Sequence, residues 1–397
     1  MDEAVPTLPL DLDQDEQFLK NPWGVWDRIR KDHGIFRAEP GTPAGESIWV
    51  CTQDQVIRDG YALGHEYFSN AILFPYHAPA ERRLGLVEMD PPIHTGLRKA
   101  MAPYFSPRVV ESRRDRMHEI AREVIGEFID RGECEFVDEF AKRYVAAIFL
   151  EYLGVPMTEL DNIIAWAYDA VHLTSAEDPD GSRRGKAMGQ IRTLMLSVAD
   201  ARREAPQEDL TTYMIKVAED TELSDADFAG TLILLFLGGL DTTAGSISFA
   251  ARHFAENPDD RTAATADEQS VRNAAEEVLR SYGILNATKL VVKDVEFHGC
   301  PVKKGDRIVF STSSAGRDAE VYPDADEFRV DRESYRHIAF GLGPHRCIGS
   351  HFARAELQVF IEEWHKHIPT YTVVDPDSVH AHGGSVMGIN KLRLSWR

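Results

Sequence analysis

Hydrophobic residues recur along most of this chain at the three-to-four-residue spacing of amphipathic helices, while short β-rich runs are few. Near the N-terminus this spacing predicts a helix from Pro22, with Val25 and Trp26 directed inward. Residues 1–20 show no sustained period, so an extended arm is expected there. Between residues 108 and about 217, helical patterns follow one another across short breaks that contain glycine or proline. The pattern therefore predicts a mainly helical protein of the α+β class.

The β-rich runs predict a small β region that accompanies the helices. The expected strands cover residues 47–52, 290–292, 295–299, 308–312, 371–374 and 391–396. After the first of these runs and a predicted helix comes an irregular stretch, residues 64–89, without firm periodicity. A structureless segment that long inside a compact domain is usually functional.

One predicted helix is apolar on nearly every side, which is typical of a helix in the middle of a core. It begins near Ser224, a plausible N-cap, and is interrupted by Gly238, Gly239, Asp241 and Thr242. Each glycine inside a helix costs roughly 1 kcal/mol relative to alanine, so the pair needs a reason. Two explanations are open: close packing against a neighbouring helix, or a pocket that an acid and an alcohol face.

Composition and charge exclude several classes of protein. The chain has 397 residues, of which 43% are hydrophobic, and a net charge of −21, which disfavours binding to nucleic acid. Four widely spaced cysteines form no disulfide framework and fit a reducing cytoplasm. The N-terminus lacks the features of a signal peptide, and the longest apolar run, residues 232–240, is too short to span a bilayer. A cytoplasmic protein without a membrane anchor is expected.

The most informative stretch runs from Phe340 through Gly343, His345 and Cys347 to Gly349 and enters a helical pattern. Glycines permit a tight bend and a close backbone approach. A cysteine where a loop becomes a helix is favoured as the thiolate, which suits either a nucleophile or a metal ligand. The other three cysteines read as small buried hydrophobic residues.

The pattern Phe-x-x-Gly-x-His-x-Cys-x-Gly resembles the haem-ligand loop of the cytochrome P450 superfamily. Two further motifs support the resemblance in the right order: Gly-Gly-x-Asp-Thr at residues 238–242 and Glu-x-x-Arg at residues 277–280. The likeness covers roughly residues 20–397, and the soluble bacterial camphor-hydroxylase-like members are the most similar in pattern. It implies a single cytochrome P450 domain over residues 1–397. That fold is a helix-rich triangular prism with a small β-rich region, in which haem lies between the central helix and the cysteine loop.

The resemblance implies that this chain binds haem b, with the thiolate of Cys347 as the axial iron ligand. The helix that begins at Asp90-Pro-Pro places His94 and Arg98 on one face, where family members bind a haem propionate. His345 is implied as a further propionate partner. Lys289 stands where the family often has arginine, so it keeps the charge but loses the bidentate fork. No catalytic base is indicated beside Cys347, which favours the ligand over the nucleophile.

The same resemblance implies roles for the two other motifs. Asp241 and Thr242 would supply protons to the reaction of dioxygen, and Gly238 and Gly239 would leave room for it. A buried structural cluster is expected at the Glu-x-x-Arg motif. Its members would be Glu277, Arg280 and Arg332.

By position, seven residues are expected to contact a small hydrophobic substrate, such as a terpenoid or an aromatic compound. For each of them simple core packing remains an alternative. Residues 64–89 would form the substrate-access loop, and Arg82 or Arg83 would bind a carboxylate if the substrate were an aromatic acid. The seven residues are Phe74, Tyr76, Leu234, Leu237, Leu285, Ala287 and Val386.

No electron-transfer module is fused to the chain, so electrons are expected from a separate ferredoxin and its NAD(P)H-dependent reductase. Arg58, Lys99 and Arg346 are the predicted docking cations on an acidic protein. The resemblance predicts a monomeric monooxygenase that hydroxylates, epoxidises or O-dealkylates its substrate. A peroxygenase or nitric oxide reductase, and a haem-based sensor without turnover, are the alternatives; the intact Asp-Thr pair weighs against the peroxygenase and the sensor.

Overall fold

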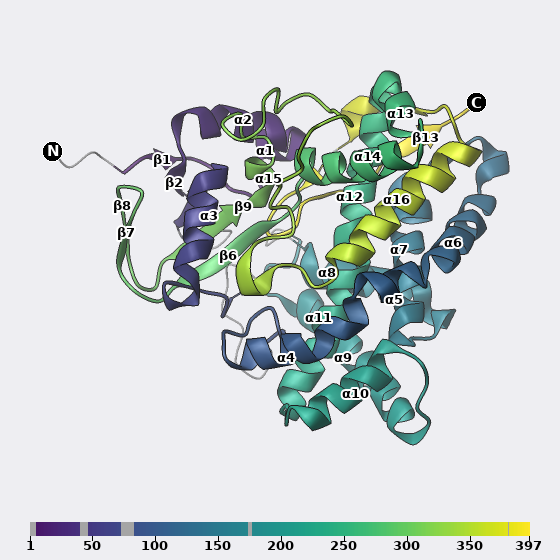
Figure 1. Cartoon of the computed structure of the whole chain (residues 1–397), viewed down its shortest axis with the longest axis horizontal. Coiled ribbons are helices and arrows are strands. Elements are labelled where there is room, and N and C mark those ends of the chain that lie inside the picture. Colours follow the sequence, from purple (N-terminus) through teal and green to yellow (C-terminus); the bar gives the residue numbers. More distant parts are fainter. Residues whose placement is uncertain (1–4, 40–46, 73–82, 174–176, 380) are drawn as a thin grey trace. The chain divides into compact units, whose positions relative to one another are not determined.

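The computed structural model describes residues 5–39, 47–72, 83–173, 177–379 and 381–397 (Figure 1). Its α-helices are α1 (Glu16–Lys20), α2 (Pro22–Asp32), α3 (Asp54–Leu63), α4 (Ile93–Met101), α5 (Pro107–Glu111), α6 (Arg114–Gly126), α7 (Lys142–Leu153), α8 (Leu160–Val171), α9 (Ser182–Glu204), α10 (Leu210–Asp220), α11 (Asp225–Leu240), α12 (Thr242–Glu256), α13 (Pro258–Ala264), α14 (Glu268–Ser281), α15 (Thr312–Ala315) and α16 (Ser350–His367). The short helical turns are η1 (Gly64–Glu66), η3 (Ala102–Phe105), η4 (Ile129–Arg131), η5 (Val137–Ala141, a π-helix), η6 (Met157–Glu159), η7 (Gly343–His345) and η8 (Pro376–Ser378). The strands are β1 (Thr7–Leu8), β2 (Ile35–Ala38), β3 (Ile48–Cys51), β4 (Phe68–Ser69), β5 (Glu133–Glu135), β6 (Asn286–Val291), β7 (Val295–Phe297), β8 (Cys300–Val302), β9 (Arg307–Ser311), β10 (Thr372–Val373), β11 (Ala381–His382), β12 (Gly388–Ile389) and β13 (Arg393–Ser395).

The chain divides into two compact units, and each unit is assembled from separate segments of the sequence. The first unit contains Met1–His77, Asn273–Cys347 and Val379–Asn390. The second contains Ala78–Arg272, Ile348–Ser378 and Lys391–Arg397.

A six-stranded sheet organises the first unit, with the strand order β1-β2-β3-β9-β6-β4. β6 and β9 are antiparallel neighbours with Ala287 opposite Phe310, and they lie side by side in Figure 1. β3 runs parallel to β9, with Val50 opposite Val309. Alternate side chains of these strands pack with α3 in a hydrophobic core. This packing fixes the strand register, because a slip of one residue would turn these core side chains toward the opposite face of the sheet.

Helices build most of the second unit. Its core helix α11 begins where the sequence predicts, because the Ser224 hydroxyl accepts a hydrogen bond of 3.1 Å from the Asp227 N–H. α16 packs along α6, as Figure 1 shows, and α7 packs on α11. α7 ends at Gly154, whose φ of +77° is the left-handed conformation that favours glycine at a helix C-terminus.

The prediction of a mainly helical α+β protein is confirmed. The prediction of an extended arm over residues 1–20 is wrong in part, because α1 forms at the end of this segment. There the Asp15 carboxylate accepts a hydrogen bond of 2.9 Å from the Phe18 N–H. The irregular stretch 64–89 contains η1 and β4 in its described part. Single strands predicted at 295–299 and 308–312 shift or shorten by one or two residues, as is usual at element ends.

The segment Asp225–Glu256, which joins α11 and α12, is long and apolar enough to cross a membrane by length and composition. However, 67% of its most apolar stretch is buried inside the protein. Core helices of globular proteins have the same properties.

Candidate functional site

The predicted haem-ligand loop forms two tight bends in the first unit. Gly341 and Gly343 both have φ of +67°, a conformation that side chains with a Cβ rarely adopt. Between the bends and the next helix, the Cys347 N–H donates a hydrogen bond of 2.8 Å to the Phe340 carbonyl. Because α16 starts at Ser350, Cys347 lies three residues before the helix rather than at its first turn. The loop therefore fixes the backbone of Cys347 through its own turn.

Cys347 differs from the other three cysteines in exposure. Its side chain is exposed, whereas Cys51, Cys134 and Cys300 are buried. Burial raises the pKa of all three buried thiols, and the nearby Cys300 raises that of Cys51 further. Iron binds the thiolate, so these three protonated thiols are poor ligands. Cys347 is the cysteine that is accessible to a large cofactor.

The predicted structural cluster is brought together in the first unit. Both nitrogens of the Arg280 fork donate hydrogen bonds of 2.7 Å to Glu277, and both side chains are fully buried. Arg332 Nε donates to the same carboxylate at 2.9 Å, and the Arg329 N–H donates at 2.8 Å. Arg280 and Arg332 also bind backbone carbonyls, including that of Glu327. The carboxylate thus has several donors that fix it in one position.

Three of the predicted substrate residues lie close together in the first unit. Leu285 and Val386 form an isolated antiparallel bridge, and Ala287 lies two residues along the chain from Leu285. Ala287 is 8% exposed within the hydrophobic core, so core packing accounts for it. Leu285 and Val386 are half-buried, and their role as substrate contacts stays a prediction.

Lys289, the predicted propionate partner, is buried on the same strand. Its Nζ donates to Asn70 Oδ1 and lies 5.6 Å from the centre of the Tyr61 ring. These contacts hold the ammonium group within the first unit. His345 ends the short turn η7 and is half-buried. The roles of both residues toward haem stay predictions.

In the second unit, α4 places His94 and Arg98 one turn apart, as predicted. His94 is 1% exposed. Burial, together with the Arg98 charge, lowers the pKa of His94 to about 4, although Asp90 acts in the opposite direction. The imidazole is therefore neutral at physiological pH and presents an N–H group and Arg98 a full charge, a donor set suited to a carboxylate.

The two glycines of α11 have different surroundings. A Cβ placed on Gly238 would meet no atom within 4 Å, and Gly238 is exposed although most of α11 is buried. A Cβ placed on Gly239 would collide with the ring of Phe149 on α7. Close packing therefore explains Gly239, whereas open space adjoins Gly238. Leu234, one turn before Gly238, is half-buried, and we call these two residues the open stripe of α11. Leu237 is buried.

Asp241 occupies the break between α11 and α12, with φ −102° and ψ −47°. Its carboxylate Oδ1 lies 2.8 Å from Nε2 of His172, at the end of α8. The next residue, Thr242, donates its hydroxyl to the Gly238 carbonyl at 3.0 Å, which leaves the oxygen lone pairs able to accept a hydrogen bond. The acid and the alcohol thus lie at one edge of the open stripe of α11.

A second acid lies close to this break. Glu356 on α16 is 2% exposed and is hydrogen-bonded to the side chain of Thr243. Burial raises the pKa of Glu356 to about 8, although the bond to Thr243 lowers it. Within the described chain, its Oε1 has no hydrogen-bond partner. The acid is therefore protonated at neutral pH.

The sequence did not indicate His172 or Glu356. His172 and Asp241 are 69 residues apart, and no spacing rule connects them. Glu356 follows Cys347 within a helical pattern in which a glutamate is usually a solvated residue. Only the packing of α8 and α16 reveals both.

Of the three predicted docking cations, two are exposed and one is paired with an acid. Arg58 donates to Asp54 Oδ2 at 3.2 Å and to the Arg336 carbonyl at 2.7 Å, so its charge is largely compensated. Lys99 and Arg346 are exposed.

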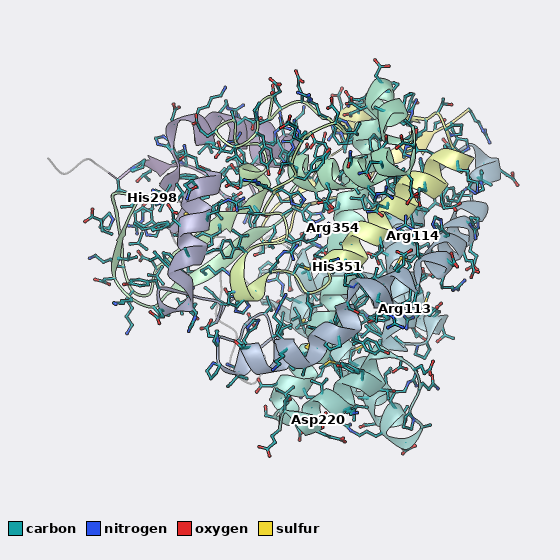
Figure 2. The ribbon with its side chains drawn as sticks, viewed as in Figure 1. Arg113, Arg114, Asp220, His298, His351 and Arg354 are labelled. Atoms are coloured by element: carbon teal, nitrogen blue, oxygen red, sulfur yellow. The ribbon has the colours of Figure 1, made fainter. Side chains whose placement is uncertain are left out.

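Further basic side chains lie at the N-terminal ends of α6 and α16 in the second unit, where Figure 2 labels Arg113, Arg114, His351 and Arg354. Arg113 lies 4.5 Å from the centre of the Tyr152 ring. Arg114 donates to Gln358 at 3.0 Å and to Glu362 at 3.1 Å, so it joins the two helices and its charge is largely compensated.

Some predicted residues fall outside the described part of the chain, namely Phe74, Tyr76 and Arg82. Arg83 is described, and its guanidinium pairs with Asp227 at 3.2 Å. This pairing accounts for the charge of Arg83 without a substrate carboxylate.

The residues present fit a haem group. Across the described ranges, no group of three or more His, Cys, Asp or Glu side chains could hold a bare metal ion. A porphyrin supplies four nitrogen ligands itself, so a single exposed thiol suffices as the protein ligand. The open stripe at Gly238 offers an apolar surface, and α4 offers donors for carboxylates.

Comparisons with known proteins identify the family of the chain. The sequence model described as Cytochrome P450 matches residues 269–364. The steroid C26-monooxygenase of Mycolicibacterium smegmatis is 30% identical over 374 residues, which cover 89% of this chain and 86% of that protein. The mycinamicin IV hydroxylase/epoxidase of Micromonospora griseorubida is 29% identical over 382 residues, which cover 94% of this chain and 91% of that protein.

The crystal structure of CYP101J2 has a TM-score of 0.85 at 26% identity and covers 100% of this chain and 98% of its own. Members of this family are monooxygenases that hold haem b through a cysteine thiolate. Taken with the cysteine loop, the interrupted core helix and the buried Glu277 cluster, these similarities show that the chain belongs to the cytochrome P450 family.

Proposed function

We propose that Cys347 is the axial ligand of the haem and that the chain is a cytoplasmic, monomeric, ferredoxin-dependent enzyme. It inserts one oxygen atom from dioxygen into a hydrophobic molecule. The observation that carries this proposal is the interrupted helix of the second unit. There an open apolar position, Gly238, adjoins an acid and an alcohol in a segment that is otherwise buried.

Bound haem would supply the iron that activates dioxygen. Around it, this chain's own residues bind and move protons. His94 and Arg98 would hold a propionate, since a carboxylate is costly to bury without donors. Thr242 would accept a hydrogen bond at its hydroxyl oxygen, and Asp241 would replace the proton that is consumed. Leu234 and the pair Leu285 and Val386 are the proposed apolar contacts of the substrate.

The ligand assignment is tested by Cys347→His. The reduced carbon monoxide complex of a haem-thiolate protein has a strongly red-shifted Soret band, and this band should disappear completely in the variant. Cys300→Ser is the matched control, because that thiol is buried and should leave the band in place. A red-shifted band that survives in Cys347→His rules out Cys347 as the ligand.

The proton-supply role is tested by Thr242→Ala with reconstituted ferredoxin, its reductase and NADH. Product formed per NADH should fall by about a hundredfold, at the low end of what a positioned proton donor contributes, while hydrogen peroxide rises to match. Thr231→Ala is the control: its hydroxyl also bonds a carbonyl one turn earlier in α11, at 2.7 Å, but lies far along the helix. Unchanged coupling in Thr242→Ala would reject the role.

The substrate class is proposed to be a terpenoid, an aromatic compound or a steroid. The proposed contacts are apolar, and one relative is named for a steroid. A screen for compounds that shift the spin state of the ferric protein identifies the class. The compound with the largest shift then serves as the reference substrate. Pairing of Arg83 with Asp227 disfavours an aromatic acid.

Electrons are proposed to come from an acidic ferredoxin that docks on the cations of α6 and α16. His351 and Arg354 follow Cys347 by four and seven residues in the sequence, so they lie near the ligand along the chain. On a protein with a net charge of −21, a local cationic patch would steer an acidic partner. A rate of reduction that does not fall with salt would contradict this docking.

A further inference from the structure

His172 is the one described histidine whose ring is hydrogen-bonded to the acid of the interrupted helix. Its side chain is 3% exposed and that of Asp241 is 19% exposed. A carboxylate only accepts hydrogen bonds, so the imidazole Nε2–H donates to Oδ1 across the distance of 2.8 Å. Because the acceptor is ionised, this hydrogen bond is charge-assisted and stronger than a bond between neutral groups.

The backbone at the break is fixed by its own hydrogen bonds. The Asp241 carbonyl accepts a bond of 3.1 Å from the Gly245 N–H, and Thr242 is bonded to Gly238. The bond from His172 reaches the Asp241 carboxylate from outside α11 and α12. A carboxylate next to an apolar helix needs such a donor to offset the loss of water.

α8 and α9 in turn fix His172. The His172 N–H caps α8 by donating to the Tyr168 carbonyl at 2.8 Å, and its ring lies 5.5 Å from the Tyr168 ring. From α9, Arg184 donates to the Leu173 carbonyl. The imidazole is therefore held at a defined place between two packed helices.

The other charged groups around this place are mostly compensated by one another. Asp169 of α8 pairs with Arg183 of α9 at 2.9 Å. The remaining groups lie near Tyr168 or accept backbone N–H bonds at the start of α9. They are Lys142 of α7, Glu177, and Asp178, which binds the N–H groups of Arg183 and Arg184.

We propose that His172 is a positioning residue, which orients the Asp241 carboxylate for proton supply. The proposal rests on the proposed function of Asp241 and Thr242.

Two variants separate orientation from simple packing. His172→Leu fills the space without a donor, and product per NADH with the reference substrate should fall by about tenfold, the effect expected for one bond to a charged group. His172→Gln keeps a neutral donor and should retain at least half of the wild-type coupling. Haem content and thermal unfolding verify that both variants fold.

A spectroscopic signal completes the test. In the diamagnetic ferrous carbon monoxide form, the wild type should show a downfield ring N–H proton resonance that is absent from His172→Gln and lost in Asp241→Ala.

The proposal is overturned if His172→Leu couples like the wild type, if His172→Gln is as defective as His172→Leu, or if Asp241→Ala retains the resonance. A wild type that makes no product would instead reject the proposed function, while the resonance still reports on the pair.

Discussion

Glu277 in the first unit and Asp241 in the second are both carboxylates inside the protein, but their partners differ in number and kind. Glu277 is fully buried and is bound by Arg280, Arg332 and a backbone N–H. Asp241 is partly exposed, and its carboxylate is bonded to the imidazole of His172. An acid that several permanent cations hold has a fixed charge and a fixed place. An acid held by a titratable group is able to exchange partners and protons, so the first suits a scaffold and the second suits chemistry.

The largest expected effect comes from breaking the fixed cluster. Glu277→Ala should lower the free energy of unfolding by about 3–5 kcal/mol, because it leaves two arginines buried without their carboxylate. Urea or thermal unfolding of the holoprotein measures this loss. Arg272→Ala is the control on the same helix: it removes an exposed pair with Glu268 and should cost less than about 1 kcal/mol. Similar losses in the two variants would refute the contrast.

Glu356 sharpens the comparison, because it is a buried acid without a cationic partner in the described structure. Between about pH 4.5 and about pH 8 the folded protein keeps a proton on Glu356 that the unfolded chain releases. The free energy of unfolding should therefore fall as the pH rises, by about 1.4 kcal/mol for each pH unit in that window. Glu356→Gln should remove this slope, which urea unfolding between about pH 5 and about pH 8 measures.

Glu363 on the same helix is the matched control. Burial alone would raise its pKa, but the bond to His118 and the charge of Arg122 lower it overall. Glu363 should therefore stabilise the protein at neutral pH and lose that contribution on acidification. Equal pH slopes in Glu356→Gln and the wild type would contradict the buried protonated state of Glu356.

The smallest expected effect separates the two glycines beside Asp241. Gly239→Ala places a methyl group against the Phe149 ring and should destabilise the protein by about 1–3 kcal/mol through overpacking. Gly238→Ala meets no atom and should stabilise the helix by up to about 1 kcal/mol, as alanine does over glycine. Thermal unfolding of the two apoproteins compares them. Equal destabilisation would mean that the open position at Gly238 is absent.

The sequence predicted those parts of the site that depend on local spacing. Glu277 and Arg280 are one turn apart on α14, and the cap at Ser224 follows from its own acidic first turn. It did not distinguish Gly238 from Gly239, because only the neighbour α7 decides which of them is packed. Likewise, His172 becomes a partner of Asp241 through the packing of α8, which no local pattern encodes.

The interleaving of the two units has a consequence for biosynthesis. The first unit needs Val379–Asn390, and the second needs Lys391–Arg397, so neither is complete until almost the whole chain has left the ribosome. Strand pairs such as β3 with β9 close loops of more than two hundred residues, which slows folding. The edges of the N-terminal strands therefore stay unpaired until β9 has been synthesised, and unpaired strand edges are prone to aggregation. Chaperones or slow translation should raise the yield of folded protein.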